Sequence, residues 1–211
     1  MSKNKHCRQH FSTIVIGTSS GGVEALKYLL PALPENFPLP VLIVIHIAPD
    51  SGDGLAKLLD SFAKIHVKEA DEGEQMRAGF AYLAPANYHL LLESDGKLAL
   101  STDVQVNFAR PSVDVLFDSA ASSLGSSVIG VILTGGANDG ARGLAKIHQS
   151  GGYTIVQDPR DAKLPSMPQH ALQLDVPDKV ICLREMPALL LELSKQKGGL
   201  PPRSVHAKER R

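Results

Sequence analysis

Ser19 lies in a glycine-rich segment with the pattern of a nucleophile elbow. Residues 17–21 match G-x-S-x-G, between a short β-branched run and a segment with helical periodicity. Small residues permit a tight strand-to-helix turn that exposes the Ser19 hydroxyl, and the first N–H groups of the helix can stabilise developing negative charge. The pattern predicts a nucleophilic serine. The same residues also suit a helix N-cap, at Ser19 or Ser20, or a phosphate-binding turn.

His46 closes an apolar run over residues 41–47 and directly precedes Ala48-Pro49-Asp50. A histidine at such a strand end suits a general base, and it also suits a hydrogen-bonded core residue. The other histidines fall in predicted strands, on predicted helices or near the chain ends: His66, His89, His148, His170, His6, His10 and His206. Since His46 alone shares the strand-end position of Ser19, it is the predicted base.

Asp139 follows a second apolar run, over residues 128–133, in the glycine-rich turn 135–140. The acid of a catalytic triad must be partly buried, because it orients and stabilises an imidazolium. Asp139 also suits the cap of the next helix. Asp158 and Asp161 are rivals for the acid role, but they lie in a polar loop that contains proline. Asp139 is therefore the predicted acid.

The three candidates each follow a different predicted parallel strand, so their side chains should converge on one rim of the sheet. We interpret them as a Ser-His-Asp triad. The chain order Ser, His, Asp differs from the Ser, Asp, His order of α/β-hydrolases. That other order would pair Asp139 with His148 or His170, which both lie on predicted helices and fit the rim less well.

The elements that position these residues alternate between strands and helices. The predicted strands are 13–16, 41–47, 128–133, 154–156 and 180–183, and the predicted helices are 23–30, 53–62, 112–124, 141–149, 168–172 and 187–193. This alternation predicts a doubly wound, mostly parallel α/β sheet in a three-layer α/β/α sandwich. Further strands at 80–83, 89–93 and 98–101 include an Asp-Gly turn at residues 94–96, which predicts an antiparallel hairpin excursion at one edge of the sheet.

Composition excludes several classes of protein. Of the 211 residues, 43% are hydrophobic, and 22 basic residues balance 22 acidic ones, so no bulk charge favours nucleic acid. The two cysteines form no disulfide framework or metal motif, which favours a reducing compartment and a cytoplasmic protein. No apolar run is long enough to span a membrane. We expect one catalytic domain over residues 11–194, between an N-terminal tail (1–10) and a basic, flexible C-terminal tail (195–211).

The chain resembles the catalytic domain of the CheB-type protein-glutamate methylesterases over about residues 14–193. The resemblance rests on the strand end at His46 and on these segments: 16–26, 67–70, 72–74, 81–85, 110–117, 130–135 and 138–140. It implies a nucleophile at Ser19, a base at His46 and an acid at Asp139, with no metal or organic cofactor. The implied reaction is hydrolysis of glutamate methyl esters on methyl-accepting chemotaxis receptors, and glutamine deamidation by the same acyl-enzyme route.

Two features depart from the family pattern. Gly136 stands where the family commonly has a methionine whose backbone N–H meets the oxyanion, and glycine retains that N–H. We expect an oxyanion site at the amides near Ser20 and Gly136. About ten residues precede the first strand, where the family usually carries a receiver domain, so we do not expect control by phosphorylation within this chain.

Two alternatives to the enzyme remain from the sequence. One is a catalytically weak or inactive domain that docks on receptors. The other is a phosphate- or nucleotide-binding α/β module at residues 17–22, which lacks the lysine of a P-loop and the full G-x-G-x-x-G spacing.

Overall fold

The structure is a computed structural model that describes residues 10–46, 54–174 and 176–195. Predictions for residues 1–9, 47–53 and 196–211, including most of both predicted tails, lie outside the described residues. Within the described part, a seven-stranded sheet has the strand order β3-β4-β2-β1-β7-β8-β9, and all of its neighbouring strands pair in parallel. The strands are β1 (Thr13–Thr18), β2 (Val41–Ile45), β3 (His66–Glu69), β4 (Phe80–Leu83), β7 (Val128–Ile132), β8 (Tyr153–Gln157) and β9 (Lys179–Ile181).

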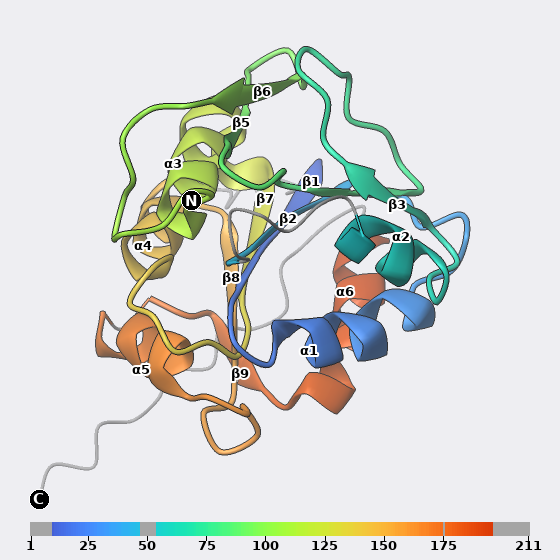
Figure 1. Cartoon of the computed structure of the whole chain (residues 1–211). Coiled ribbons are helices and arrows are strands. Elements are labelled where there is room, and N and C mark those ends of the chain that lie inside the picture. Colours follow the sequence, from blue (N-terminus) through green and yellow to red (C-terminus); the bar gives the residue numbers. More distant parts are fainter. Residues whose placement is uncertain (1–9, 47–53, 175, 196–211) are drawn as a thin grey trace, which may run out of the picture.

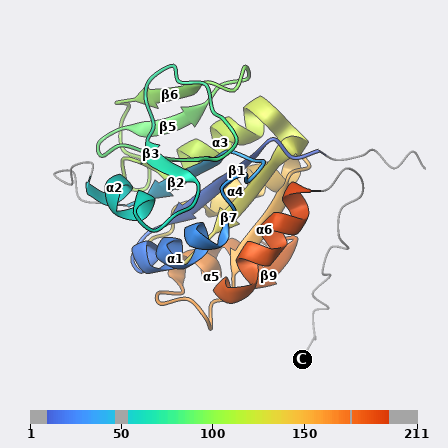
Figure 2. The same cartoon turned by 90° about the vertical axis from the view of Figure 1, so that its right-hand side faces the viewer.

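Helices cover both faces of this sheet (Figures 1 and 2). One face packs against α1 (Gly22–Leu29), α2 (Gly54–Asp60) and α6 (Met186–Ser194). The other face packs against α3 (Val113–Leu124), α4 (Ala141–Gln149) and α5 (Ser166–Gln173). Short 3₁₀ turns follow α1 and α3 and precede α6: η1 (Leu30–Ala32), η2 (Gly125–Ser127) and η3 (Leu183–Glu185). The predicted three-layer α/β/α sandwich is confirmed.

The central strands are mostly apolar because both of their faces are buried. On β1, Ile14 and Ile16 enter the core beneath α1, α2 and α6, whereas Val15 enters the core on the α3 side. All three side chains are fully buried. The sequence of a strand that helices cover on both faces is a nearly continuous run of aliphatic residues. For this reason β1, β2 and β7 could be predicted from the sequence.

The predicted hairpin is present as β5 (His89–Leu92) and β6 (Leu98–Ser101), which pair in antiparallel register. It forms a separate two-stranded sheet against α3 and does not extend an edge of the main sheet, as Figure 1 shows. The Leu92 N–H donates to the Ser119 hydroxyl of α3, and the Ser123 hydroxyl donates back to the Leu92 carbonyl. Apolar residues of the hairpin join the core on the α3 side, so packing on a helix replaces pairing with the sheet.

The order of the strands reverses next to β1. In the sheet β1 lies between β2 and β7, and the helices that follow β1 and β7 lie on opposite faces. Such a switch point opens a crevice at the carboxyl ends of the strands, where α/β proteins place their functional groups. Ser19, His46 and Asp139 follow β1, β2 and β7, so the fold brings these three chain segments to one crevice.

Candidate active site

The elbow at Ser19 is tied to the neighbouring strand end. The Ser19 N–H donates to the carbonyl of Thr134 at 3.1 Å, and the Ser19 carbonyl accepts the N–H of Gly22, the first residue of α1, at 2.8 Å. The Thr134 hydroxyl donates to the carbonyl of Ser20 at 3.1 Å. The segment therefore has the strand–turn–helix form of a nucleophile elbow, with Ser19 at the point where the chain reverses.

Gly135 permits a close approach between this elbow and the turn after β7. A Cβ atom added to Gly135 would lie 2.0 Å from the sulfur of Met167 and 2.9 Å from the Cβ of Ser19. Both distances are too short for a real side chain, so any residue larger than glycine would displace the elbow or α5. Gly135 thus sets the position of Ser19 without contributing a functional group.

His46 and Ser19 occupy equivalent positions on adjacent strands. Thr18 of β1 pairs in register with Ile45 of β2, so the next residue on each strand is Ser19 or His46. The His46 N–H donates to the Thr18 carbonyl at 3.3 Å, which continues the parallel pairing by one bond. Neighbouring strands run about 4.8 Å apart, so the serine and the histidine leave the sheet side by side.

His46 and Asp139 form a hydrogen-bonded pair. The distance from His46 Nε2 to Asp139 Oδ2 is 2.9 Å, and the side chains are 16% and 0% exposed respectively. A carboxylate accepts hydrogen bonds and donates none, so Nε2 carries the proton and Nδ1 of the neutral ring keeps a free lone pair. The arrangement is that of a general base oriented by a buried acid.

Five donors among the described residues hold Asp139. Oδ2 accepts the bond from His46 and a bond of 2.6 Å from the backbone N–H of Val113. Oδ1 accepts bonds from the side chains of Asn107 and Ser112 at 3.0 and 2.9 Å, and from the backbone N–H of Asp114 at 3.0 Å. Val113 and Asp114 begin α3, whose own N-cap Ser112 makes no side-chain capping bond. Asp139 therefore accepts from the amino-terminal end of α3.

These contacts keep Asp139 ionised. Burial raises the pKa of the Asp139 carboxyl, but hydrogen bonds from His46, Asn107 and the backbone of Asp114 and Val113 outweigh burial, so the pKa lies below its ordinary value. The carboxylate also faces the positive end of the α3 macrodipole. The alternative that Asp139 caps the next helix is wrong, since α4 begins after Gly140 without any side-chain capping bond.

The rival acids of the sequence lie elsewhere. The Asp158 carboxylate pairs with Arg160 at 2.6 Å, and hydrogen bonds from Arg160 lower the pKa of Asp158 to about 2. Asp161 accepts bonds from the Gln157 side chain and the Leu183 N–H. Among the described residues, the carboxylate that contacts His46 belongs to Asp139.

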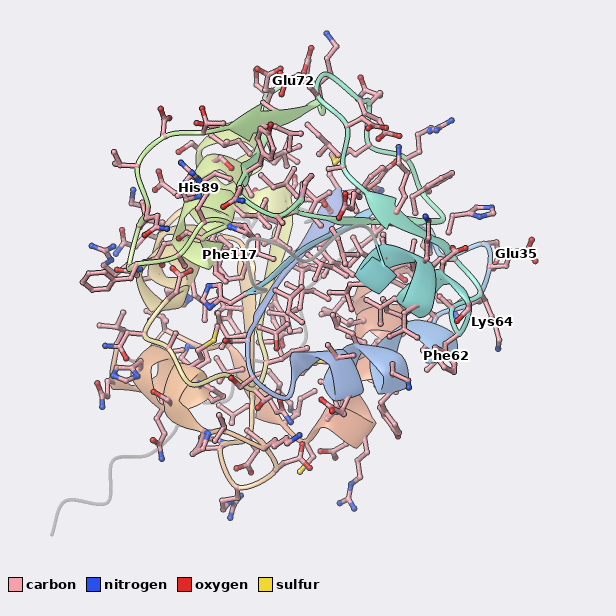
Figure 3. The ribbon with its side chains drawn as sticks, viewed as in Figure 1. Glu35, Phe62, Lys64, Glu72, His89 and Phe117 are labelled. Carbon is pink, nitrogen blue, oxygen red and sulfur yellow. The ribbon has the colours of Figure 1, made fainter. Side chains whose placement is uncertain are left out.

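Four of the rival histidines lie on elements other than those that carry the elbow, whereas His6 and His206 lie outside the described residues. His66 and His89 lie on β3 and β5, and His148 and His170 lie on α4 and α5, as predicted. His89, labelled in Figure 3, is buried, and its ring accepts the Ser112 N–H at 3.2 Å. It therefore supports the start of α3 through Ser112, whose hydroxyl donates to Asp139.

Two backbone amides beside Ser19 are free to bind an anion. Within the described part of the chain, the N–H groups of Ser20 and Gly136 donate to no protein acceptor. Ser20 and Gly136 are both exposed, and the neighbouring Gly135 N–H is already bonded to the Leu164 carbonyl at 2.9 Å. Free amides on the two turns that flank a serine can hold a tetrahedral oxyanion.

A cavity of about 250 Å³ opens beside the histidine. Its lining includes His46, Asn107, Phe108, Arg110 and Ala137. Across the described residues, no cluster of three metal-ligating side chains occurs and no helix is long and apolar enough to cross a membrane.

Sequence reasoning missed two of the groups that hold Asp139, namely Asn107 and Ser112. Ser112 is the first residue of the helix predicted over residues 112–124, and nothing in that position marks its hydroxyl as a partner of the acid. The hydroxyl donates to Asp139, which is distant in sequence. Asn107 lies in a loop without periodicity, and no local signal marks its amide as a partner of the acid.

The fold and this site define an α/β protein with a serine elbow next to a paired histidine and aspartate. The CheB methylesterase family model matches residues 14–190, and the chain belongs to this family. The crystal structure of the Thermotoga maritima CheB methylesterase catalytic domain superposes with a TM-score of 0.83 at 38% identity, covering 87% of this chain and 98% of that chain. The resemblance and the fold class predicted from the sequence are both confirmed.

Curated relatives differ in how much of their length this chain spans. A protein of Leptospira interrogans is 42% identical over 186 residues, which make up 88% of this chain and 96% of that protein. A Chromohalobacter salexigens protein, named protein-glutamate methylesterase/protein-glutamine glutaminase, is 42% identical over 188 residues. The matched region is 88% of this chain and 53% of that relative, so the chain spans about half of the longer protein.

Proposed function

We propose that this chain is a serine hydrolase that removes methyl groups from glutamate methyl esters of methyl-accepting chemotaxis receptors, acting in the cytoplasm on the helical part of the receptor. The observation that carries the proposal is the His46–Asp139 pair beside the Ser19 elbow. The name of the Chromohalobacter salexigens relative supports the ester substrate, and it also supports deamidation of glutamine.

Acylation begins with transfer of the Ser19 hydroxyl proton to His46. Because Nε2 is bonded to Asp139, the nitrogen that takes this proton is Nδ1. The Ser19 oxygen attacks the ester carbonyl, and the amides of Ser20 and Gly136 hold the resulting oxyanion. The C–O bond to the methoxy group then breaks as His46 returns the proton to it, and methanol leaves. Asp139 stabilises the imidazolium between these steps.

Deacylation repeats the same proton movements with water. His46 takes a proton from a water molecule as the water oxygen attacks the acyl-enzyme, and it returns the proton to Ser19. The products are a free glutamate side chain and the original enzyme. A glutamine substrate would release ammonia in place of methanol through the same acyl-enzyme. The residues of the site supply every proton transfer, so the route requires no cofactor or metal.

Labelling of Ser19 by a fluorophosphonate, together with methanol release from a methylated receptor fragment, tests the proposal. We expect the wild type to be labelled and to release methanol, and Ser19→Ala to do neither. A folded wild type that fails in both assays would favour an inactive receptor-docking domain or an anion-binding module. Labelling without methanol release would retain the hydrolase and overturn the receptor ester as its substrate.

A further inference from the structure

The loop between β6 and α3 contains a tight turn with an unusual residue. Val106 and Ala109 exchange two backbone hydrogen bonds, of 3.1 and 3.0 Å. The residues between them, Asn107 and Phe108, have φ angles of 53° and 61°. Two consecutive positive φ angles inside such a pair define a type I′ turn, in which Asn-Gly is the favoured sequence. Phe108 therefore occupies the position that glycine fills with least strain.

The folded protein gains no stability from the Phe108 side chain. The ring is 98% exposed, so it buries almost no apolar surface against the rest of the chain. A bulky residue in the left-handed region is a steric outlier, and such outliers concentrate where a side chain serves binding or catalysis. The reason for an aromatic residue at this position must lie in something that the protein binds.

The turn is fixed relative to the His46–Asp139 pair. The Asn107 side-chain amide donates to Asp139 at 3.0 Å and to Asp114 at 2.9 Å. Its oxygen accepts a bond of 3.4 Å from Arg142. These contacts tie the residue that precedes Phe108 to the catalytic acid and to the ends of two helices. The backbone turn that carries the exposed ring is thus held next to the active site.

Phe108 and His46 line the same cavity of about 250 Å³. Arg110 also lines this cavity, but its Nη1 donates to the carbonyls of Thr102 and Asp103. The methyl ester itself must reach the hydroxyl of Ser19 in the turn between β1 and α1. A nearly fully exposed ring on the rim therefore meets parts of the substrate beyond the ester.

We infer that Phe108 is a substrate-binding residue that packs on an apolar side chain of the substrate polypeptide, next to the modified glutamate. This inference rests on the proposed function. The occupant is a polypeptide because the proposed substrate is a glutamate methyl ester within a protein, and the ring lines the same cavity as His46, next to the turn that Asn107 ties to Asp139. Phe108 would thus distinguish a protein ester from a small ester that carries no such side chain.

The test compares two substrates in Phe108→Gly and Phe108→Ala. With a methylated receptor fragment, we expect kcat/KM for methanol release to fall about ten- to hundredfold, mainly through KM, because one buried aromatic contact is lost. With 4-nitrophenyl acetate, we expect kcat/KM to change by about twofold or less. The melting temperature of Phe108→Gly should not fall, since glycine relieves the strained backbone.

Two further variants serve as matched controls. Phe108→Trp should retain most of the activity on the receptor fragment. Val104→Ala should leave both substrates unaffected, because Val104 is 83% exposed on the same loop but does not line the cavity.

Other outcomes overturn the inference. Full activity of Phe108→Gly on the receptor fragment would overturn it. An equal loss of kcat/KM on both substrates would also overturn it, as would a Phe108→Gly variant in which only the self-association of the protein changes. A wild type that hydrolyses 4-nitrophenyl acetate but releases no methanol overturns the proposed function and this inference together. If the wild type releases methanol from the receptor fragment, the proposed function holds, and the activity of Phe108→Gly on that fragment then tests the role of Phe108 alone.

Discussion

Replacing Asp139 by asparagine keeps the volume of the side chain but removes its charge and turns one acceptor oxygen into a donor. Two donors face Oδ2 and three face Oδ1. Whichever oxygen becomes the amide nitrogen, at least two of these donors lose their acceptor. The substitution therefore disturbs both His46 and the start of α3.

The size of both effects follows from these contacts. Hydrogen bonds to a charged group contribute about 1.5–3 kcal/mol each, so the loss of two predicts a decrease of about 3 kcal/mol or more in the free energy of unfolding. For a domain of this size that is a fall of about 6–12 °C in melting temperature. Loss of the charge that stabilises the imidazolium predicts a fall in kcat of about three to four orders of magnitude.

Steady-state methanol release and a thermal melt measure the two effects separately. Asp158→Asn is the matched control, because it makes the same chemical change at another strand end, where the carboxylate is paired with Arg160 and does not contact His46. Wild-type turnover in Asp139→Asn would refute the triad acid. Lower stability with unchanged turnover would show that Asp139 stabilises the start of α3 but has no role in catalysis.

The same variant has a defined pH dependence. Hydrogen bonds hold the pKa of Asp139 in the folded protein below its ordinary value, despite burial. A lowered folded pKa contributes stability that is fully present above the unfolded pKa of about 3.9 and is lost as pH falls through the folded pKa. Urea unfolding should therefore show the stability gap between wild type and Asp139→Asn narrowing below about pH 4. A gap that stays constant to pH 3 would contradict a carboxylate ionised in the native state.

Ser19→Ala should lower methanol release by about 10⁴-fold or more while the circular dichroism stays native, and Ser20→Ala should be much milder. Gly135→Ala should lose most activity, because its Cβ would lie 2.9 Å from that of Ser19. Gly136→Ala should be far milder in the same assay, because its Cβ would lie 3.4 Å from Leu164 and its backbone N–H is kept. Asn107→Gly should remove one hydrogen bond to the acid, lowering kcat about tenfold, and should also raise KM for the receptor fragment because the contacts that fix the turn beside Phe108 are lost.

The central strands and most helices could be predicted because their signals are local. The helix at residues 141–149 was predicted with the bounds that α4 has, since glycines flank it on both sides. The edge strand β3 carries a weaker signal, which placed His66 in a strand but gave that strand no bounds. It buries Val67 but exposes His66 and leaves Lys68 half-buried, so its sequence has no apolar run. Its position depends on pairing with β4, which the sequence does not show directly.

The candidate triad was predictable for a topological reason, and its supporting groups were not. The carboxyl ends of parallel strands share one edge of a sheet, so residues that follow three aliphatic strands converge whatever the loops between them do. Asn107 and Ser112 reach Asp139 only because the chain between β6 and α3 crosses to that edge. That path is decided by the packing of the hairpin on α3, which involves residues far apart in sequence.

The position of α3 explains how a fully buried Asp139 stays charged. Burial alone would favour a neutral carboxylic acid, which could not stabilise an imidazolium. The first N–H groups of a helix need acceptors, and Val113 and Asp114 find them on Asp139. Gly140 permits this contact, because a Cβ there would lie 2.6 Å from Val113 and would push the helix away. The helix and the acid therefore satisfy each other, and the charge that orients His46 is maintained by a helix end that lacks a side-chain cap of its own.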